Sequence, residues 1–238
     1  MSQNVYRRKL AELVFRNAQV GRAEIFGASD DRLHPISEVR DTEVMFAGYV
    51  GERYRPKGCV LVAINPGGGG DDYRRTPEDS RFYPLLYALK EASKTERLAA
   101  FKAVNRAFVT IVRGWNVWLV IYEGLVATGF SIEEVAYLNA VPYRTRQNKT
   151  PPVAAQAAAW EKVTRPLLSA LDPKLILALG KPAGEILSRF YKGDGDVFKI
   201  RRTNGDRYLH DDARATLDQI RRRQRITRRW SRPSRCYD

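Results

Sequence analysis

A short apolar run that ends in a polar residue and a row of glycines is the feature that most constrains the fold of this chain. Residues 59–64 read CVLVAI, which has the length and the β-branched content of a strand buried on both faces. Asn65 and Pro66 end the run, because proline cannot donate a hydrogen bond within the middle of a sheet. The four glycines at 67–70 allow positive φ angles and the close approach of a ligand. Open α/β sheets bind ligands at such strand ends, although an ordinary exit from a strand into a loop has the same pattern.

Further apolar runs alternate with helical patterns along the rest of the chain. Residues 135–141 and 174–179 are as apolar as the first run, residues 197–200 form a weaker one, and residues 43–50 suit either a strand or a covered loop. Helices are predicted at 6–20, 76–92, 95–112, 115–127, 153–171, 181–191 and from about 211 onward. Strands separated by helices indicate a parallel sheet that is covered on both faces. We therefore predict a three-layer α/β/α sandwich around a central, mostly parallel four-stranded sheet.

Two further stretches carry local predictions. Residues 21–42 have a mixed composition without a clear period and are predicted to form a loop. Trp115, Trp118 and Tyr122 fall at helical spacing, and Gly129 suits the end of that helix. We interpret the aromatic stripe as core packing rather than as a platform for stacking on bases.

The net charge of +14 predicts a polyanionic partner, and nucleic acid is the first candidate. Eight arginines and one acidic residue lie within residues 221–238, so about half of the net charge belongs to this short segment. A charge that served only to solvate the surface would be spread more evenly. We therefore predict a single domain over residues 1–220, followed by a basic C-terminal tail over residues 221–238.

Cysteine usage and hydropathy exclude several classes of protein. The only cysteines, Cys59 and Cys236, lie in a presumed core strand and in the tail, which favours a reducing cytosol over a disulfide-bonded secreted protein. Two cysteines and two histidines are too few for a zinc site or an iron–sulfur cluster, so we expect no metal and no cofactor. The sequence has no apolar run of about eighteen residues, and its first residues lack the apolar segment of a signal peptide. A cytoplasmic protein without a membrane partner is expected.

Three segments together resemble the uracil-DNA glycosylase superfamily. AINPG at 63–67 is similar to a motif at the end of the family's first core strand, in which an asparagine positions the hydrolytic water. YLNAVPYRTRQNKTP at 137–151 is similar to the strand and loop whose asparagine reads the flipped uracil. DPKLILALGKPAG at 172–184 is similar to another strand of the family. The resemblance extends over roughly residues 59–215 and implies a monofunctional DNA glycosylase of base excision repair.

The chain departs from the family's pattern in three places. His210, in RYLHDDAR, is the candidate for the family's C-terminal histidine, but an aspartate follows it where the family has proline. The cysteines that hold an iron–sulfur cluster in one branch of the family are absent. Gly67 stands where the most uracil-selective branch has a tyrosine that excludes thymine. The resemblance therefore leaves the range of bases open among uracil, thymine, hypoxanthine and other lesions.

The resemblance implies roles for three polar residues. Asn65 would hold the attacking water, because an amide can position a water but cannot deprotonate it strongly. Asn139 would read O4 and N3–H of uracil, and His210 would stabilise the departing anion at O2. Asn139 is alternatively a turn-capping residue, and His210 a surface histidine at a helix start. Asp71 and Asp72 offer a carboxylate to the site, although solvated loop acids are the favoured interpretation.

Apolar residues would complete the substrate pocket. Phe82 would stack on the flipped base, with Tyr73 and Tyr83 as competitors for that role. Core packing on its own helix is the alternative for Phe82. Ile64 and Gly67 would line the pocket beside Asn65.

Basic residues near the pocket predict DNA as the partner. Arg144, Arg146 and Lys149 would contact phosphates, and the arginine-rich tail would add salt-sensitive affinity without sequence preference. We expect a monomer that acts on uracil-containing DNA. Two other classes stay open: a non-catalytic nucleic-acid-binding module with the same fold, and a nucleotide-binding α/β enzyme. No G-K-[ST] follows the glycines, which disfavours an ATP-type phosphate loop.

Overall fold

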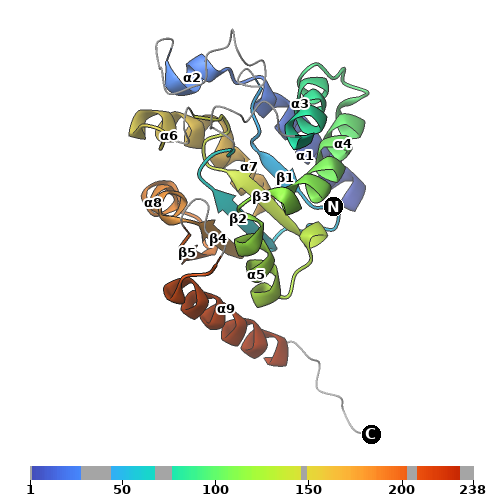
Figure 1. Cartoon of the computed structure of the whole chain (residues 1–238). Helices are drawn as coiled ribbons and strands as arrows, with labels where there is room; N and C mark the ends of the chain where they lie inside the picture. The colour runs from blue at the N-terminus through green and yellow to red at the C-terminus, as the bar shows by residue number, and fades with distance from the viewer. Residues whose placement is uncertain (1, 28–43, 68–76, 146–148, 203–207, 231–238) are drawn as a thin grey trace, which may run out of the picture.

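A five-stranded mixed sheet forms the centre of the protein (Figure 1). The computed structural model describes residues 2–27, 44–67, 77–145, 149–202 and 208–230. The strands are β1 (Gly48–Val50), β2 (Cys59–Ala63), β3 (Val135–Asn139), β4 (Leu175–Leu179) and β5 (Asp196–Ile200), in the spatial order β1-β3-β2-β4-β5. Strands β2 to β5 are parallel, whereas β1 pairs antiparallel with β3. The predicted α/β class is confirmed, but the predicted four strands are wrong, because residues 48–50 add a fifth.

The three middle strands are buried along their whole length. Every residue of β2, β3 and β4 is buried, and this is why each strand reads as a continuous apolar run rather than an alternating one. Strand β5, at the other edge of the sheet, is only partly buried. Burial raises the pKa of the Cys59 thiol far above its ordinary value, so this side chain behaves as a small apolar core residue.

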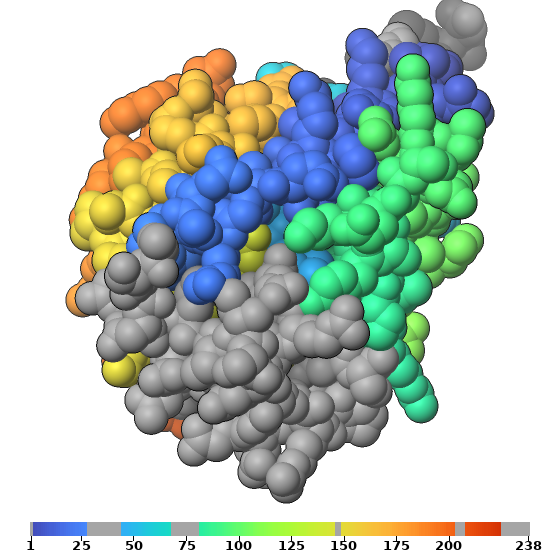
Figure 2. Space-filling model, turned by 90° about the horizontal axis from the view of Figure 1, so that it is seen from above, coloured from blue at the N-terminus to red at the C-terminus, as the bar shows by residue number. Residues whose placement is uncertain are grey.

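Helices connect the strands in the order expected of a parallel sheet. Helices α3 (Pro77–Lys90), α4 (Arg97–Ile111) and α5 (Trp118–Thr128) lie between β2 and β3; α6 (Val153–Ala159) and α7 (Arg165–Leu171) lie between β3 and β4; α8 (Lys181–Phe190) lies between β4 and β5. Helices α1 (Gln3–Ala18) and α2 (Arg22–Phe26) precede the sheet, and α9 (Asp211–Trp230) follows it. Seen from above, α1 and α2 form a band between α3–α4 on one side and α6 on the other (Figure 2).

Helices α5 and α8 cover opposite faces of the sheet. A Cβ on Gly124 of α5 would lie 3.1 Å from Leu177 Cδ1, so α5 packs on the face of β4 that carries Leu177. A Cβ on Gly184 of α8 would lie 3.0 Å from the stem of Lys199, which pairs with Ala178 across β4 and β5. Ala178 and Leu177 are successive residues of one strand and therefore point to opposite faces. The sheet is thus enclosed between helices, which leaves its strand ends as the places where a ligand can enter.

Side chains from α1 and α4 cover the free edge of β1. Arg7 donates from Nη1 to the carbonyls of Val50, at 3.1 Å, and Gly51, at 2.7 Å. Asn105 Oδ1 accepts from the amide of Val50 at 3.0 Å. These bonds satisfy edge groups that would otherwise face another strand or water. The segment before β1, which contains Phe46, is held separately, since the Phe46 amide donates to the Pro142 carbonyl at 2.8 Å.

Most of the predicted helices are confirmed, with three differences. Helix α2 forms inside the predicted loop at 21–42, where Glu24 caps it by accepting from the Gly21 amide at 2.9 Å. The sequence did not indicate this helix, because five residues are too few to show a helical period. The helix predicted at 153–171 contains a π-helical stretch, Trp160–Thr164, between α6 and α7. The predicted boundary at residue 220 falls within α9, which continues to Trp230. In the parts of the chain described above, no helix is both long enough and apolar enough to cross a membrane.

Candidate active site

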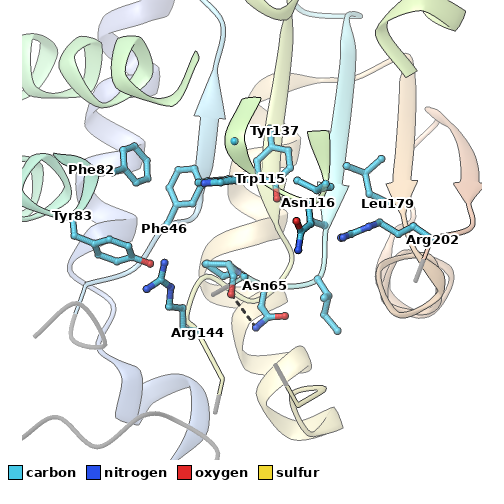
Figure 3. A pocket seen from close by; sticks show the side chains of 16 residues that line it. Phe46, Asn65, Phe82, Tyr83, Trp115, Asn116, Tyr137, Arg144, Leu179 and Arg202 are labelled. Atoms are coloured by element: carbon cyan, nitrogen blue, oxygen red, sulfur yellow. Dashed lines mark hydrogen bonds between the residues drawn. The ribbon is translucent and has the colours of Figure 1, made fainter. Parts of the chain in front are cut away.

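A cavity of about 270 Å³ opens at the carboxyl ends of the parallel strands (Figure 3). Its walls come from the ends of β2, β4 and β5, the segment before β1, the middle of α3 and the turn before α5. The lining residues are Phe46, Ala63, Ile64, Asn65, Pro66, Gly67, Phe82, Tyr83, Gly114, Trp115, Asn116, Val117, Tyr137, Arg144, Leu179 and Arg202. The volume is just below the roughly 300–1,000 Å³ of pockets that hold drug-sized ligands, which favours a ligand of one or two rings.

The strand order explains why the cavity lies at this end of β2. The chain leaves β2 for β3 on one side, and later crosses back past β2 to form β4 on the other side. The connections diverge at such a point and leave a crevice, where open α/β sheets bind their ligands. The cavity thus lies at the strand end that the apolar run at 59–64 and the following Asn65 single out in the sequence.

Aromatic rings form the inner wall of the cavity. The ring of Phe46 meets Phe82 edge-on at 4.9 Å between centroids, and lies 6.2 Å from Trp115 and 6.4 Å from Tyr137. Phe46 and Phe82 are both buried. Rings packed edge to face in this way form a rigid, apolar wall, against which a planar ligand can pack.

Asn65 is held by a short chain of hydrogen bonds on the polar side of the cavity. Its Nδ2 donates to Thr145 Oγ1 at 3.0 Å, and the Thr145 hydroxyl donates to the carbonyl of Lys149 at 2.6 Å. A weaker contact of 3.4 Å joins the same Nδ2 to the Pro66 carbonyl. The Thr145 hydroxyl gives its one proton to Lys149 and can only accept from Asn65, which fixes the orientation of the amide. Among the described residues, Oδ1 of Asn65 accepts no hydrogen bond. As far as the described residues are concerned, the amide oxygen is open to a water or a ligand in the cavity.

We expect Thr145→Val to lower the free energy of unfolding by about 1–3 kcal/mol, because it leaves the Lys149 carbonyl and the Asn65 amide without their partner. The Thr145 side chain is fully buried, so water replaces these bonds poorly. Urea denaturation followed by circular dichroism measures the effect. Thr216→Val is the matched control, since its hydroxyl bonds only within α9, to the Asp212 carbonyl, and its loss is expected to change stability by less than about 0.5 kcal/mol. Equal stabilities of the two variants would contradict the assigned role.

Two arginines lie at opposite ends of the cavity. The guanidinium of Arg144 lies 4.6 Å from the ring centre of Tyr83, and that of Arg202 is directed toward Asn116 on the other side (Figure 3). Among the described lining residues there is no aspartate or glutamate. The described part of the lining therefore favours a ligand that carries, or develops, negative charge.

Tyr137 lies at the base of the cavity as a neutral hydroxyl. Burial raises its pKa well above the ordinary tyrosine value, and the positive charge of Arg202 acts in the opposite direction. Its hydroxyl donates to Asn139 Oδ1 at 3.5 Å. Tyr137 is thus a hydrogen-bond donor at physiological pH, and it is not a candidate for proton abstraction.

The structure brings together five of the residues predicted from the sequence to form the site. Ile64, Asn65, Gly67, Phe82 and Arg144 all line the cavity. Tyr83, named as a competitor for stacking, lines it as well. A Cβ at residue 67 would meet no atom within 4 Å among the described parts of the chain, so the wall at that point is open.

Three predicted site residues do not line the cavity. Asn139 is buried, and its Nδ2 donates to the Phe46 carbonyl at 2.9 Å, which makes it a structural link between β3 and the segment before β1. His210 precedes α9 with its ring 5.2 Å from that of Tyr208. Lys149 is exposed, and its backbone carbonyl accepts from Thr145. Arg146, Asp71, Asp72 and Tyr73 lie outside the described residues.

Two predictions from the sequence become more specific in the structure. Arg144, predicted to contact DNA phosphates beside the pocket, lines the cavity and is only 7 % exposed, because its guanidinium packs against Tyr83. Of the stripe predicted to pack in the core, Trp115 and Trp118 do pack against the core and Trp115 also lines the cavity, whereas Tyr122 is 51 % exposed. Helix α5 begins only at Trp118, so Trp115 belongs to the preceding turn and not to the helical stripe.

The sequence reasoning missed Phe46, Asn116, Tyr137 and Arg202 as residues of the site. Arg202 lies two residues beyond the predicted strand at 197–200, so a search of the segment after each parallel strand would have found it. The other three carry no such signal, since they reach the cavity through long-range packing.

No protein-family model matches the chain, and no curated protein matches it. Within the described ranges, no three histidine, cysteine or acidic side chains come together as a metal ion would require. The site is therefore interpreted from its own geometry.

Proposed function

We propose that this protein is a DNA glycosylase that hydrolyses the N-glycosidic bond of uracil in DNA and leaves an abasic site. The observation that carries the proposal is the amide of Asn65, oriented by Thr145 at the carboxyl end of β2, in a small cavity walled by Phe46 and Phe82. A flipped base needs such an apolar wall and such a polar group beside it. The net charge of +14 supports DNA as the polymer that carries the base.

Asn65 would act by positioning a water. With Nδ2 bound to Thr145, Oδ1 accepts a hydrogen bond from a water below the sugar and directs its oxygen toward C1′. An amide does not remove a proton from water at neutral pH, so the sugar must develop positive charge before the water attacks. We therefore expect a slower enzyme than one that carries a carboxylate at this position.

Asn116 is the amide that would read the edge of the base. It is exposed on the cavity wall near Asn65, and its side chain offers one donor group and one acceptor (Figure 3). This pair matches O4 and N3–H of uracil. Asn139, for which the sequence predicted this role, donates a hydrogen bond from Nδ2 to the Phe46 carbonyl instead.

Contacts to the DNA backbone would come from basic residues around the mouth of the cavity and from those that follow α9 in the sequence. Lys149 is exposed beside the loop that holds Asn65. Two arginines of the predicted tail have acidic partners in the protein instead: Arg221 lies 3.1 Å from Glu123, and Arg223 lies 2.7 Å from Asp196. These two pairs fasten α9 to α5 and β5, so the phosphate contacts of the tail are proposed for the residues that follow.

The direct test is release of uracil from labelled oligonucleotides. The protein, prepared from a host that lacks its own uracil glycosylase, is incubated with single strands, U:A duplexes and U:G duplexes, and abasic sites are then cleaved with alkali. We expect cleavage at uracil in at least one of these substrates and none in thymine-containing controls paired with adenine. Absence of cleavage in all three would refute the proposal, and salt-dependent DNA binding without cleavage would instead indicate a non-catalytic binding module.

A further inference from the structure

Arg202 reaches the cavity by passing close to Gly180 at the end of β4. It lies two residues beyond β5, and its stem passes Gly180, the residue directly after β4. Gly180 has a φ of +101°, and a Cβ there would lie 3.4 Å from Arg202 Cγ. The left-handed backbone and the missing side chain at residue 180 leave room for the arginine stem. The position of this cation is thus built into the fold.

The surroundings of Arg202 suit an anion that forms during a reaction. Leu179 lies beside the Arg202 side chain and makes the nearby wall apolar, and a charge acts more strongly there than in water (Figure 3). The guanidinium is directed toward Asn116, the amide proposed above to read the base (Figure 3). In the proposed complex, Arg202 would therefore lie next to a carbonyl oxygen of the base that Asn116 binds.

We propose that Arg202 stabilises the negative charge on the uracil as it departs, the role that the sequence suggested for His210. This inference rests on the proposed glycosylase function. In the step, the C1′–N1 bond breaks and its electron pair leaves with N1, which gives the uracil anion. The oxygen of the water bonds to C1′, the water loses one proton to solvent, and the anion takes up one proton from solvent. Arginine remains charged throughout, so it acts as a fixed cation and not as an acid.

The test compares two leaving groups in single-turnover experiments. Arg202→Met keeps a long apolar stem beside Gly180 and removes the charge, whereas Arg202→Lys keeps the charge. Uracil is compared with 5-fluorouracil, whose fluorine withdraws electrons and stabilises the anion without help. We expect Arg202→Met to lower the rate about 100-fold on uracil and clearly less on 5-fluorouracil, with partial recovery in Arg202→Lys. Arg201→Met is the matched control, because Arg201 is exposed, pairs with Asp212 at 3.4 Å and does not line the cavity.

The possible outcomes separate this inference from the proposed function. A wild-type protein that releases uracil, together with an Arg202→Met protein that is equally fast or is slowed equally on both bases, overturns the role of Arg202 alone. A wild-type protein that releases neither base overturns the glycosylase function and this inference with it. If thermal melting shows that Arg202→Met is unfolded, Arg202→Gln takes its place and the same comparison of the two bases decides.

Discussion

Asn65→Ala is expected to lower the single-turnover rate of uracil release by about 100-fold or more, because the water then lacks the group that directs it toward C1′. The affinity for uracil-containing DNA should change little, since the lost interaction is made in the transition state and not with the bound base. Asn65 is partly buried on the polar side of the cavity, and its side-chain hydrogen bonds to the described residues are donated by Nδ2. Rates are measured by alkaline cleavage, and affinity by fluorescence anisotropy.

Gln19→Ala controls for the loss of an exposed amide elsewhere. Gln19 donates to the Lys90 carbonyl at 2.8 Å and does not line the cavity. Its rate should equal that of the wild-type protein. An Asn65→Ala protein that is folded and keeps the full rate would show that Asn65 does not position the water, even if the protein proves to be a glycosylase.

Phe46→Ala is expected to lower the free energy of unfolding by about 3–5 kcal/mol, the cost of removing a large aromatic side chain from a packed core. Phe46 is 2 % exposed and contacts Phe82, Phe108, Trp115 and Tyr137. Its removal enlarges the cavity and leaves these rings without their common neighbour. The midpoint of urea denaturation should fall clearly, and uracil release should fall with it, because the aromatic wall against which the base would stack is lost.

Phe46→Leu and Tyr122→Ala test whether the effect belongs to this position. Leucine keeps most of the volume and should cost less than about 1.5 kcal/mol. Tyr122 is an aromatic residue that is 51 % exposed, and its truncation should change stability by less than about 0.5 kcal/mol. A Phe46→Ala protein as stable as Tyr122→Ala would contradict the central place given to Phe46 in the aromatic wall.

The central strands could be predicted from the sequence because their burial is encoded locally. A strand covered by helices on both faces must be apolar at every position, so residues 59–63 and 135–139 stand out without any knowledge of their neighbours. β1 could not be recognised in the same way. It has three residues, and it is a strand only because β3 offers its edge to it.

The same distinction between local and long-range information applies to the residues of the site. The position of Asn65 follows from the sequence, because a polar residue that ends a buried parallel strand must lie at the ligand-binding end of the sheet. The orientation of a side chain does not follow, since it depends on partners far along the chain. Asn139 also ends a parallel strand, but the Phe46 carbonyl, 93 residues away, takes its amide.

The sequence by itself therefore determined that the end of β2 belongs to the cavity, and with it Asn65 and Gly67, because a strand buried on both faces is apolar at every position. Only the tertiary structure decided which cation and which amide enter that cavity. Arg202 does so because Gly180, which has no side chain, leaves room for its stem beside the end of β4, and Asn116 does so because the turn before α5 lines the same cavity as the end of β2. Both depend on packing between segments that no local pattern connects.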